Sequence, residues 1–178
     1  VEVPADFKNY VEKLAEVSGV CISSFDDMIM ALQNRHDFFA EQGCKLSDHG
    51  IEEFYAEDYT DAEIRVIFNK VYGGKDLTYE EILKFKSAML VIFGEMDYET
   101  GWTQQFHYGA IRNNNTNMFR LLGPDTGFDS IGEFMTAKAM AKYLDRLNSK
   151  GKLTKTILYN LNPCANEVIA TMIGNFQD

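Results

Sequence analysis

The stretch TILYNL, at residues 156–161, is the part of the sequence that decides the fold class. It is a short apolar run that ends at Asn162-Pro163, where the proline cannot donate to a strand ladder. A run of this length is typical of a strand covered on both faces, as the strands of parallel sheets are. We therefore expect a buried parallel strand here.

Two other segments have weaker strand patterns. Residues 103–110 alternate, with Phe106 and Tyr108 on one face and Gln105 and His107 on the other. Residues 44–48 are the third candidate. Helical patterns separate these three segments, and strands that alternate with helices indicate an α/β fold with parallel strands and right-handed crossovers.

Helix boundaries are well marked in this sequence. Capping boxes of the form S/T-x-x-E begin at Thr60, Thr78 and Ser130, and in each box the hydroxyl and the glutamate accept bonds from two otherwise unpaired N–H groups. Glycines at 73–74, 101 and 151 supply the matching ends. These signals predict helices at 60–72, 78–99 and 130–149. Apolar residues spaced three or four apart predict two earlier helices, at about 6–17 and 22–43.

Composition and charge narrow the range of functions. The chain has 178 residues, 46% of them hydrophobic, and a formal net charge of −10. Nucleic acids and anionic membranes require a basic surface, so this acidity argues against both as partners. A single arginine in a pocket can still bind a small anion. The three cysteines are widely spaced and form no CxxC motif, which favours a reducing, cytoplasmic location.

The segment 109–129 is a long stretch with little periodicity, directly after the strand at 103–110. Loops of this length inside a domain are usually functional, and in α/β folds ligands bind at the carboxyl ends of the strands. Arg112, which three asparagines follow, is a candidate fork for a carboxylate or a phosphate. The alternative is a loop arginine that pairs with Asp125 or Asp129.

Two histidines are further candidates. His107 lies near the end of its strand and could reach a bound ligand, although a hydrogen-bonded core histidine fits the same pattern. Asp48-His49 could serve acid–base chemistry or metal binding, but adjacent strand residues point to opposite faces and are not expected to act on one atom. Asp48 could instead cap a following turn. We expect structural roles for His36 and, as small core residues, for Cys44 and Cys164.

Three sequence blocks carry a family resemblance. They are GCKLSDH at 43–49, WTQQFHYGAIRNNNTNMFRLLGPDTG at 102–127, and TILYNLNP at 156–163 with the trailing MIGNF at 172–176. Together they resemble the uronate isomerase family of bacterial hexuronate breakdown. The resemblance implies a (β/α)8 barrel of the amidohydrolase superfamily, which interconverts D-glucuronate with D-fructuronate and D-galacturonate with D-tagaturonate.

The resemblance also implies that the chain is an internal segment of a longer barrel. The family holds a divalent metal, zinc or similar, with a His-x-His pair and an aspartate, and this sequence contains neither the pair nor the aspartate block. We expect a partial barrel domain over 1–178, with a helical lead-in at 1–43 and late β/α units with about three parallel strands at 44–178. We expect these residues alone to hold no metal, to be catalytically silent and to self-associate through open sheet edges.

Site residues follow from the same resemblance. His107 matches the family's active-site histidine, and Arg112 matches an arginine near the substrate carboxylate. His49 matches a histidine at the barrel mouth and is expected to bind substrate. The leading function is therefore aldose–ketose isomerisation of hexuronates by the full-length enzyme. Two alternatives stay open: a non-catalytic acidic α/β module that binds a sugar acid or a protein, and a metal-dependent hydrolase of the same superfamily.

Overall fold

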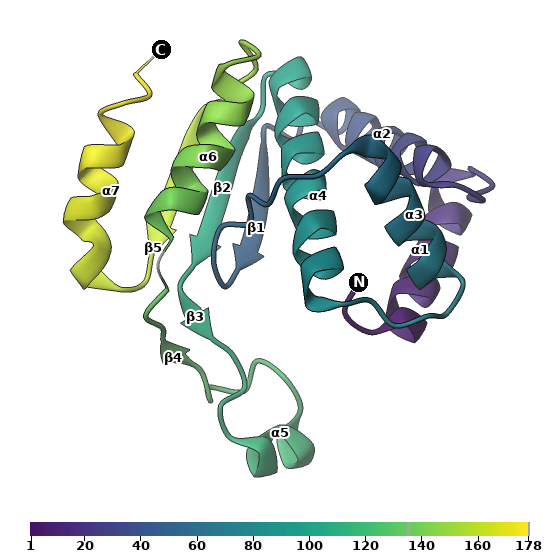
Figure 1. The fold of residues 1–178 in the computed structure, drawn as a ribbon, viewed down its shortest axis with the longest axis horizontal. Helices are drawn as coiled ribbons and strands as arrows, with labels where there is room; N and C mark the ends of the chain where they lie inside the picture. Colours follow the sequence, from purple (N-terminus) through teal and green to yellow (C-terminus); the bar gives the residue numbers. More distant parts are fainter. Residues whose placement is uncertain (135, 178) are drawn as a thin grey trace.

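A three-stranded parallel sheet lies at the centre of the structure, a computed structural model that describes residues 1–134 and 136–177. The strands are β1 (Leu46–Ile51), β2 (Thr103–Tyr108) and β5 (Thr156–Asn160), in the order β1-β2-β5. Both pairings are parallel, which confirms the expected α/β class with about three parallel strands. Figure 1 shows the three strands running in the same direction.

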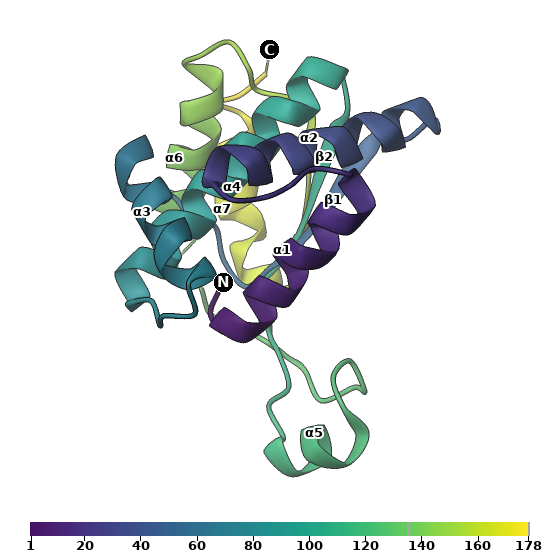
Figure 2. The same ribbon diagram turned by 90° about the vertical axis from the view of Figure 1, so that its right-hand side faces the viewer.

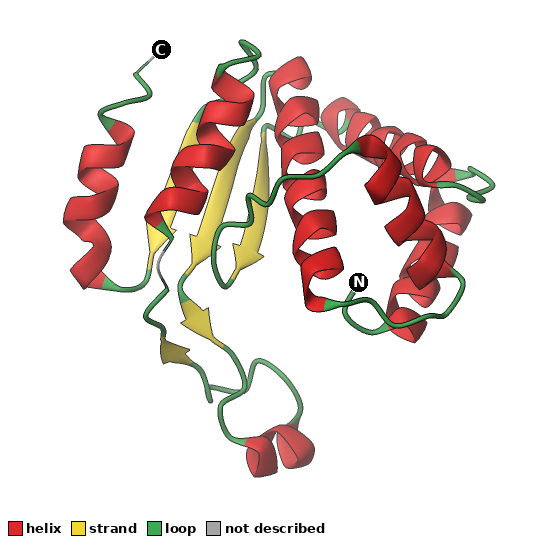
Figure 3. Ribbon diagram, in the orientation of Figure 1, coloured by secondary structure: helices red, strands yellow, loops and turns green. Residues whose placement is uncertain are grey.

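Helices cover one face of this sheet and continue into a bundle beside β1 (Figures 1 and 3). The sheet is covered by α4 (Tyr79–Thr100) and α6 (Ala137–Asn148), and α7 (Asn166–Ile173) packs beside α6. The bundle comprises α1 (Pro4–Ser18), α2 (Phe25–Glu41) and α3 (Asp61–Tyr72). In the part of the chain that the structure describes, no helix has both the length and the apolarity needed to cross a lipid bilayer.

Capping boxes set the beginnings of three helices. The boxes at Thr60 and Thr78 form as predicted, and α3 and α4 begin directly after them. A further box, Ser24 with Asp27, begins α2 at Phe25 rather than at residue 22. The sequence analysis missed this box because aspartate replaces the usual glutamate at the third helical position.

The predicted helix start at Ser130 is wrong. Ser130–Ile131 form the short strand β4, which pairs antiparallel with β3 (Ala110–Ile111), and α6 begins only at Ala137. The pairing with β3 gives hydrogen-bond partners to backbone groups of Ser130–Ile131. In the first turn of a helix the backbone N–H groups would have no such partners within the helix. Tertiary contact has therefore overridden the local capping signal.

The segment 109–129 is more regular than the expected aperiodic loop. After β3 it forms the short helix α5 (Thr116–Leu122), where the side chain of Asn115 accepts a bond from the Met118 N–H. The pairing of β3 with β4 carries this segment away from the body, beyond the carboxyl end of β2 (Figures 1 and 2). Its base, where Arg112 lies, is therefore at the edge of the sheet where α/β proteins bind ligands.

The expectation that β5 is covered on both faces is wrong. Exposure alternates along this strand, and Ile157 and Tyr159 are 40% and 43% exposed. Exposure alternates in the same way along β1 and β2, so all three strands share one open face. An apolar run such as 156–161 therefore does not show that both faces of the strand are covered within this chain.

The cysteines are not the core residues that the sequence analysis expected. Cys164 and Cys21 are exposed, Cys44 is half-buried, and all three are free. Cys164 lies in the turn Pro163–Ala165, whose backbone is capped by the side chain of Asn162. Proline and asparagine make this short segment a surface turn, and its cysteine is on the surface with it.

Two apolar cores hold the elements together. One lies among α1, α2, α3 and the beginning of α4 and includes the fully buried Val11 and Phe68. The other lies between the sheet and helices α4 and α6 and includes Phe106 and Tyr143. Helices α1 and α2 precede residue 43, yet they share this first core with α3, which follows it. The division of the domain into a helical lead-in at 1–43 and β/α units at 44–178 therefore stays a prediction.

The helix-to-helix contact between α4 and α6 depends on Gly94. A Cβ at this position would come within 2.6 Å of Leu147 Cδ1 and 2.9 Å of the Tyr143 hydroxyl, and both side chains are buried. Overpacking typically costs about 1–3 kcal/mol, more than the roughly 1 kcal/mol that alanine gains over glycine in a helix. We expect Gly94→Ala to lower the free energy of unfolding in urea. Gly50→Ala, whose Cβ would meet nothing within 4 Å, is the matched control and should cost little.

Glu63 makes the stability of α3 depend on pH. Its carboxylate accepts bonds from Lys84 Nζ and from the backbone and hydroxyl of Thr60, and these bonds lower its pKa from 4.5 to about 2. A lowered pKa gives stability that is present above 4.5 and is lost as the pH falls toward 2. We expect Glu63→Gln to lower the melting temperature at pH 7 and the difference to close between pH 4.5 and 2. A difference that stays constant with pH would contradict this assignment.

Candidate functional site

The open face of the sheet gathers the polar side chains of all three strands. Strand register places Asp48, Gln105 and Ile157 side by side in one row. The next row toward the carboxyl ends comprises Gly50, His107 and Tyr159. Gly50 leaves open space beside His107, because a Cβ there would meet nothing within 4 Å. The face is therefore open at Gly50, beside His107.

Asp48 and His107 form a pair across β1 and β2. His107 Nε2 lies 3.2 Å from Asp48 Oδ1, and the two side chains are 50% and 56% exposed. They occupy diagonal positions on neighbouring strands, which long side chains can span. A carboxylate and an imidazole in contact, both open to solvent, are an acid–base pair that a ligand can reach.

Tyr159 fixes the plane of the His107 ring. The two rings are stacked, with centroids 4.4 Å apart and an angle of 9° between their planes. The Tyr159 hydroxyl donates a hydrogen bond of 2.9 Å to Gln105 Oε1, which holds the tyrosine in turn. The imidazole is therefore held against rotation with Nε2 directed toward Asp48.

A buried network anchors β2 behind this pair. Gln104, fully buried on the helix side, accepts a bond of 2.7 Å from the Tyr143 hydroxyl of α6 and donates one of 2.7 Å to Thr156 of β5. Buried polar groups that are fully paired fix one arrangement of the elements that carry them. The register that aligns His107 with Tyr159 is thereby tied to α6.

Arg112 lies just after β3 and already has carboxylate partners. Its Nη1 is 2.7 Å from Asp129 and 3.9 Å from Asp125, so the ion pairing that the sequence left open as an alternative does occur. Asp129 also accepts a bond from the Asn113 N–H, and both contacts lower the pKa of its carboxyl group. Among the described residues the ion pairs of Arg112 use only Nη1. Its Nε and Nη2 edge can therefore still bind a second carboxylate in a bidentate manner.

His49 does not join this group. As expected for neighbours on a strand, it points to the face opposite to Asp48, where it stacks on Phe106 and Phe93. Burial lowers the pKa of its imidazole below 6.5. Its assignment to substrate binding stays a prediction, and of the candidate histidines only His107 is brought against Asp48 on the open face of the described residues.

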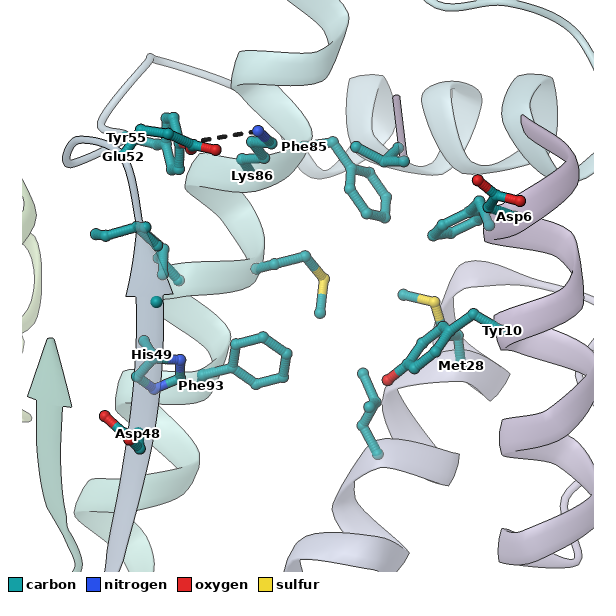
Figure 4. Close-up of a pocket in the computed structure, with 17 residues that line it drawn as sticks. Asp6, Tyr10, Met28, Asp48, His49, Glu52, Tyr55, Phe85, Lys86 and Phe93 are labelled. Carbon is teal, nitrogen blue, oxygen red and sulfur yellow. Dashed lines mark hydrogen bonds between the residues drawn. The ribbon is translucent and has the colours of Figure 1, made fainter. Parts of the chain in front are cut away.

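A cavity of about 620 Å³ lies on the helix side of β1, between this strand and helices α1, α2 and α4. Figure 4 shows His49 and Phe93 directed into it and Asp48 directed away from it. Most of its lining is apolar, with Tyr10, Met28 and Phe85 among the residues on its walls. Charged residues such as Asp6, Glu52 and Lys86 also line it, but its mainly apolar wall suits a polyhydroxylated acid less well than the open face does.

His36 has the structural role that the sequence analysis expected. Its ring stacks on Trp102 with centroids 3.9 Å apart, and its Nε2 lies 3.0 Å from Asp97 Oδ1. Over residues 1–134 and 136–177, no three His, Cys, Asp or Glu side chains are grouped so that they could hold a metal ion.

The sequence did not reveal the partner of Asp48 or any role for Tyr159. It offered acid–base chemistry, metal binding or a turn cap for Asp48, but beside His49 rather than His107, and Tyr159 only as part of an apolar run. The missing information is the register of β1, β2 and β5, because a shift of one residue would move each side chain to the other face.

Comparisons with known proteins cover the whole chain. The family described as glucuronate isomerase matches residues 1–178. The uronate isomerases of Bacteroides thetaiotaomicron and Cellvibrio japonicus are 86% and 58% identical to it over 178 residues. In both cases the match covers all of this chain but only 38% of the relative, so the chain spans well under half the length of these relatives.

Two solved structures resemble the fold. The crystal structure of uronate isomerase from Thermotoga maritima matches 95% of this chain and 37% of its own, with 36% identity and a TM-score of 0.89. That of glucuronate isomerase from Caulobacter crescentus matches 88% of this chain and 32% of its own, with 29% identity and a TM-score of 0.79. The three parallel strands and their helices are thus part of a barrel of the (β/α)8 type, as expected from the sequence.

Proposed function

Because this chain belongs to the glucuronate isomerase family, we propose that it supplies part of the active site of an enzyme that isomerises hexuronates between aldose and ketose forms. The expected substrate pairs are D-glucuronate with D-fructuronate and D-galacturonate with D-tagaturonate. The contact of 3.2 Å between Asp48 and His107 on the open face carries this proposal. In a barrel, this face of the strands lines the interior.

The acid–base pair suits the reaction chemically. Aldose–ketose isomerisation moves one proton from C2 to C1 and one proton between the two oxygens, through an enediol. We assign the carbon-to-carbon transfer to the Asp48 carboxylate, which accepts the C2 proton and returns it to C1. His107 bonds to this carboxylate through Nε2, and we assign to its imidazole the second transfer, in which the proton of the C2 hydroxyl is taken up and returned to the oxygen on C1. Tyr159, which stacks on the imidazole, restrains the plane of the ring.

Arg112 would hold the far end of the substrate. A uronate carries a carboxylate at C6, and a guanidinium can bind it with two parallel hydrogen bonds. The Nη1 contact with Asp129 orients the guanidinium and leaves its other edge for the substrate. Binding at the far end then places C1 and C2 against the acid–base pair.

The proposal extends to the metal and to the cellular location. We expect the family's divalent metal to be held by residues outside this chain, and no step above is assigned to it. The three free cysteines support a reducing, cytoplasmic location. The outer edges of β1 and β5 have no partner strand within the described residues, so we expect the rest of the full-length chain to cover them and the isolated segment to self-associate.

A hybrid chain tests the proposed function. In this hybrid the 178 residues replace the matched 38% of the Bacteroides thetaiotaomicron uronate isomerase. We expect it to convert D-glucuronate to D-fructuronate, followed by NMR, whereas the 178 residues alone with zinc or manganese should give no ketose. A folded hybrid that forms no ketose, in an assay where the unaltered relative is active, would overturn the proposal.

A further inference from the structure

A chain of polar side chains, half-buried except for the fully buried Asp97, lies directly behind Asp48 on the helix side of β1. We call it the Asp97 network, and it comprises His36, Ser47, His49 and Asp97. Asp97 Oδ1 is 3.0 Å from His36 Nε2, and Asp97 Oδ2 is 2.5 Å from Ser47 Oγ. Ser47 Oγ is in turn 3.2 Å from His49 Nε2. The network thus joins α2, α4 and β1.

The proton positions in this network follow from the carboxylate. An ionised carboxylate only accepts, so both the Ser47 hydroxyl and His36 Nε2–H donate to Asp97. The Ser47 hydroxyl has then used its one proton, and His49 Nε2–H must donate to Ser47 Oγ. Every bond therefore points toward Asp97, whose side chain is only 1% exposed.

A buried carboxylate at this place needs an explanation beyond stability. Burying a charge is costly, and an apolar side chain of similar size often serves a core equally well. Ser47 and His49, the two residues that the network holds, are the sequence neighbours of Asp48. Within the described residues β1 pairs only with β2, so no strand holds its outer edge.

We propose that Asp97 is a positioning residue for the Asp48–His107 pair and acts through Ser47 and His49. Asp97 accepts a hydrogen bond from Ser47, which in turn contacts His49, and these are the residues on either side of Asp48. Asp97 thereby ties this part of β1 to α4. The backbone of Asp48 is then fixed with its carboxylate on the open face, 3.2 Å from His107. This inference rests on the proposed function.

Asp97→Asn and Ser47→Ala in the hybrid chain test the proposal. The amide introduced by Asp97→Asn keeps the shape of the side chain but presents N–H groups where the network needs an acceptor. We expect each variant to lower kcat for D-glucuronate by about 10- to 100-fold, because small displacements of a reacting group cost this much. KM should change by less than about threefold, since Ser47 and Asp97, the two residues replaced, lie on the helix side of β1, away from the open face. The double variant should lose no more kcat than the worse of the two single variants, because Asp97 and Ser47 act through one chain of contacts.

Ser87→Ala is the matched control. Ser87 is also fully buried on α4, but its hydroxyl bonds to the backbone of Glu57 and Leu83 rather than to β1. It should lower the melting temperature with kcat within about threefold of the unaltered hybrid. If Ser47→Ala and Asp97→Asn behave like Ser87→Ala, or if their effects on kcat multiply, the proposal is overturned. Activity that survives Asp48→Asn and His107→Asn would instead overturn the proposed function.

Discussion

Replacing His107 by asparagine is expected to lower kcat of the full-length hybrid on D-glucuronate by about 100- to 10,000-fold, the range for losing a general acid–base group. Asparagine keeps a polar side chain that can still bond to Asp48 but cannot take up or release a proton. KM should change far less than kcat, because the lost interaction belongs to the transition state. Steady-state kinetics at saturating substrate measures this effect.

Tyr159→Phe is the control for this result. Phenylalanine keeps the ring that stacks on His107 and removes only the hydroxyl that bonds to Gln105. It should cost much less kcat than His107→Asn. If His107→Asn instead keeps near-normal kcat and lowers only the melting temperature, His107 is a structural residue of the sheet.

Arg112→Lys is expected to lower kcat/KM for D-glucuronate by about ten- to a hundredfold. Lysine keeps the charge but loses the fork, and a hydrogen bond to a charged group is worth about 1.5–3 kcal/mol. At about 1.4 kcal/mol per factor of ten this gives the stated range. The loss should be small for D-glucose, which has no carboxylate to bind. Parallel kinetics with both sugars separates the two cases.

The ion pair of Arg112 with Asp129 provides a second way in which Arg112→Lys could lower activity. Asp129 already bonds to Nη1, so Arg112→Lys could also loosen the segment that follows β3. Such a loss would affect both sugars equally. An equal loss would therefore make Arg112 a structural residue of this segment, and the substrate carboxylate would bind elsewhere.

Local patterns predicted much of the fold. The boxes at Thr60 and Thr78 place α3 and α4 to within one residue, because a capping box is a complete local unit. The alternation at 103–108 also placed Phe106 in the core and His107 on the opposite face. At Ser130 the local pattern gave the wrong element, because this capping sequence forms a strand that pairs with Ile111 of β3.

The candidate site was only partly predictable for the same reason. His107 and Arg112 lie in one stretch of sequence, and the resemblance assigns site roles to both, whereas the sequence pattern alone left structural roles open for each. The partner of His107 lies 59 residues earlier, and no local pattern gives the register that aligns β1 with β2. The stacking of Tyr159 on His107 and the contact of Asp97 with Ser47 likewise depend on packing between distant elements.

A double-mutant cycle on Asp48 and His107 tests the central claim most directly. In the hybrid chain, kcat for D-glucuronate is measured for Asp48→Asn, for His107→Asn and for the double variant. If the two side chains act as one acid–base pair, each single variant loses most of the activity and the double variant loses no more than the worse of the two. Losses that multiply, or single variants within about threefold of the unaltered hybrid, would contradict the pair.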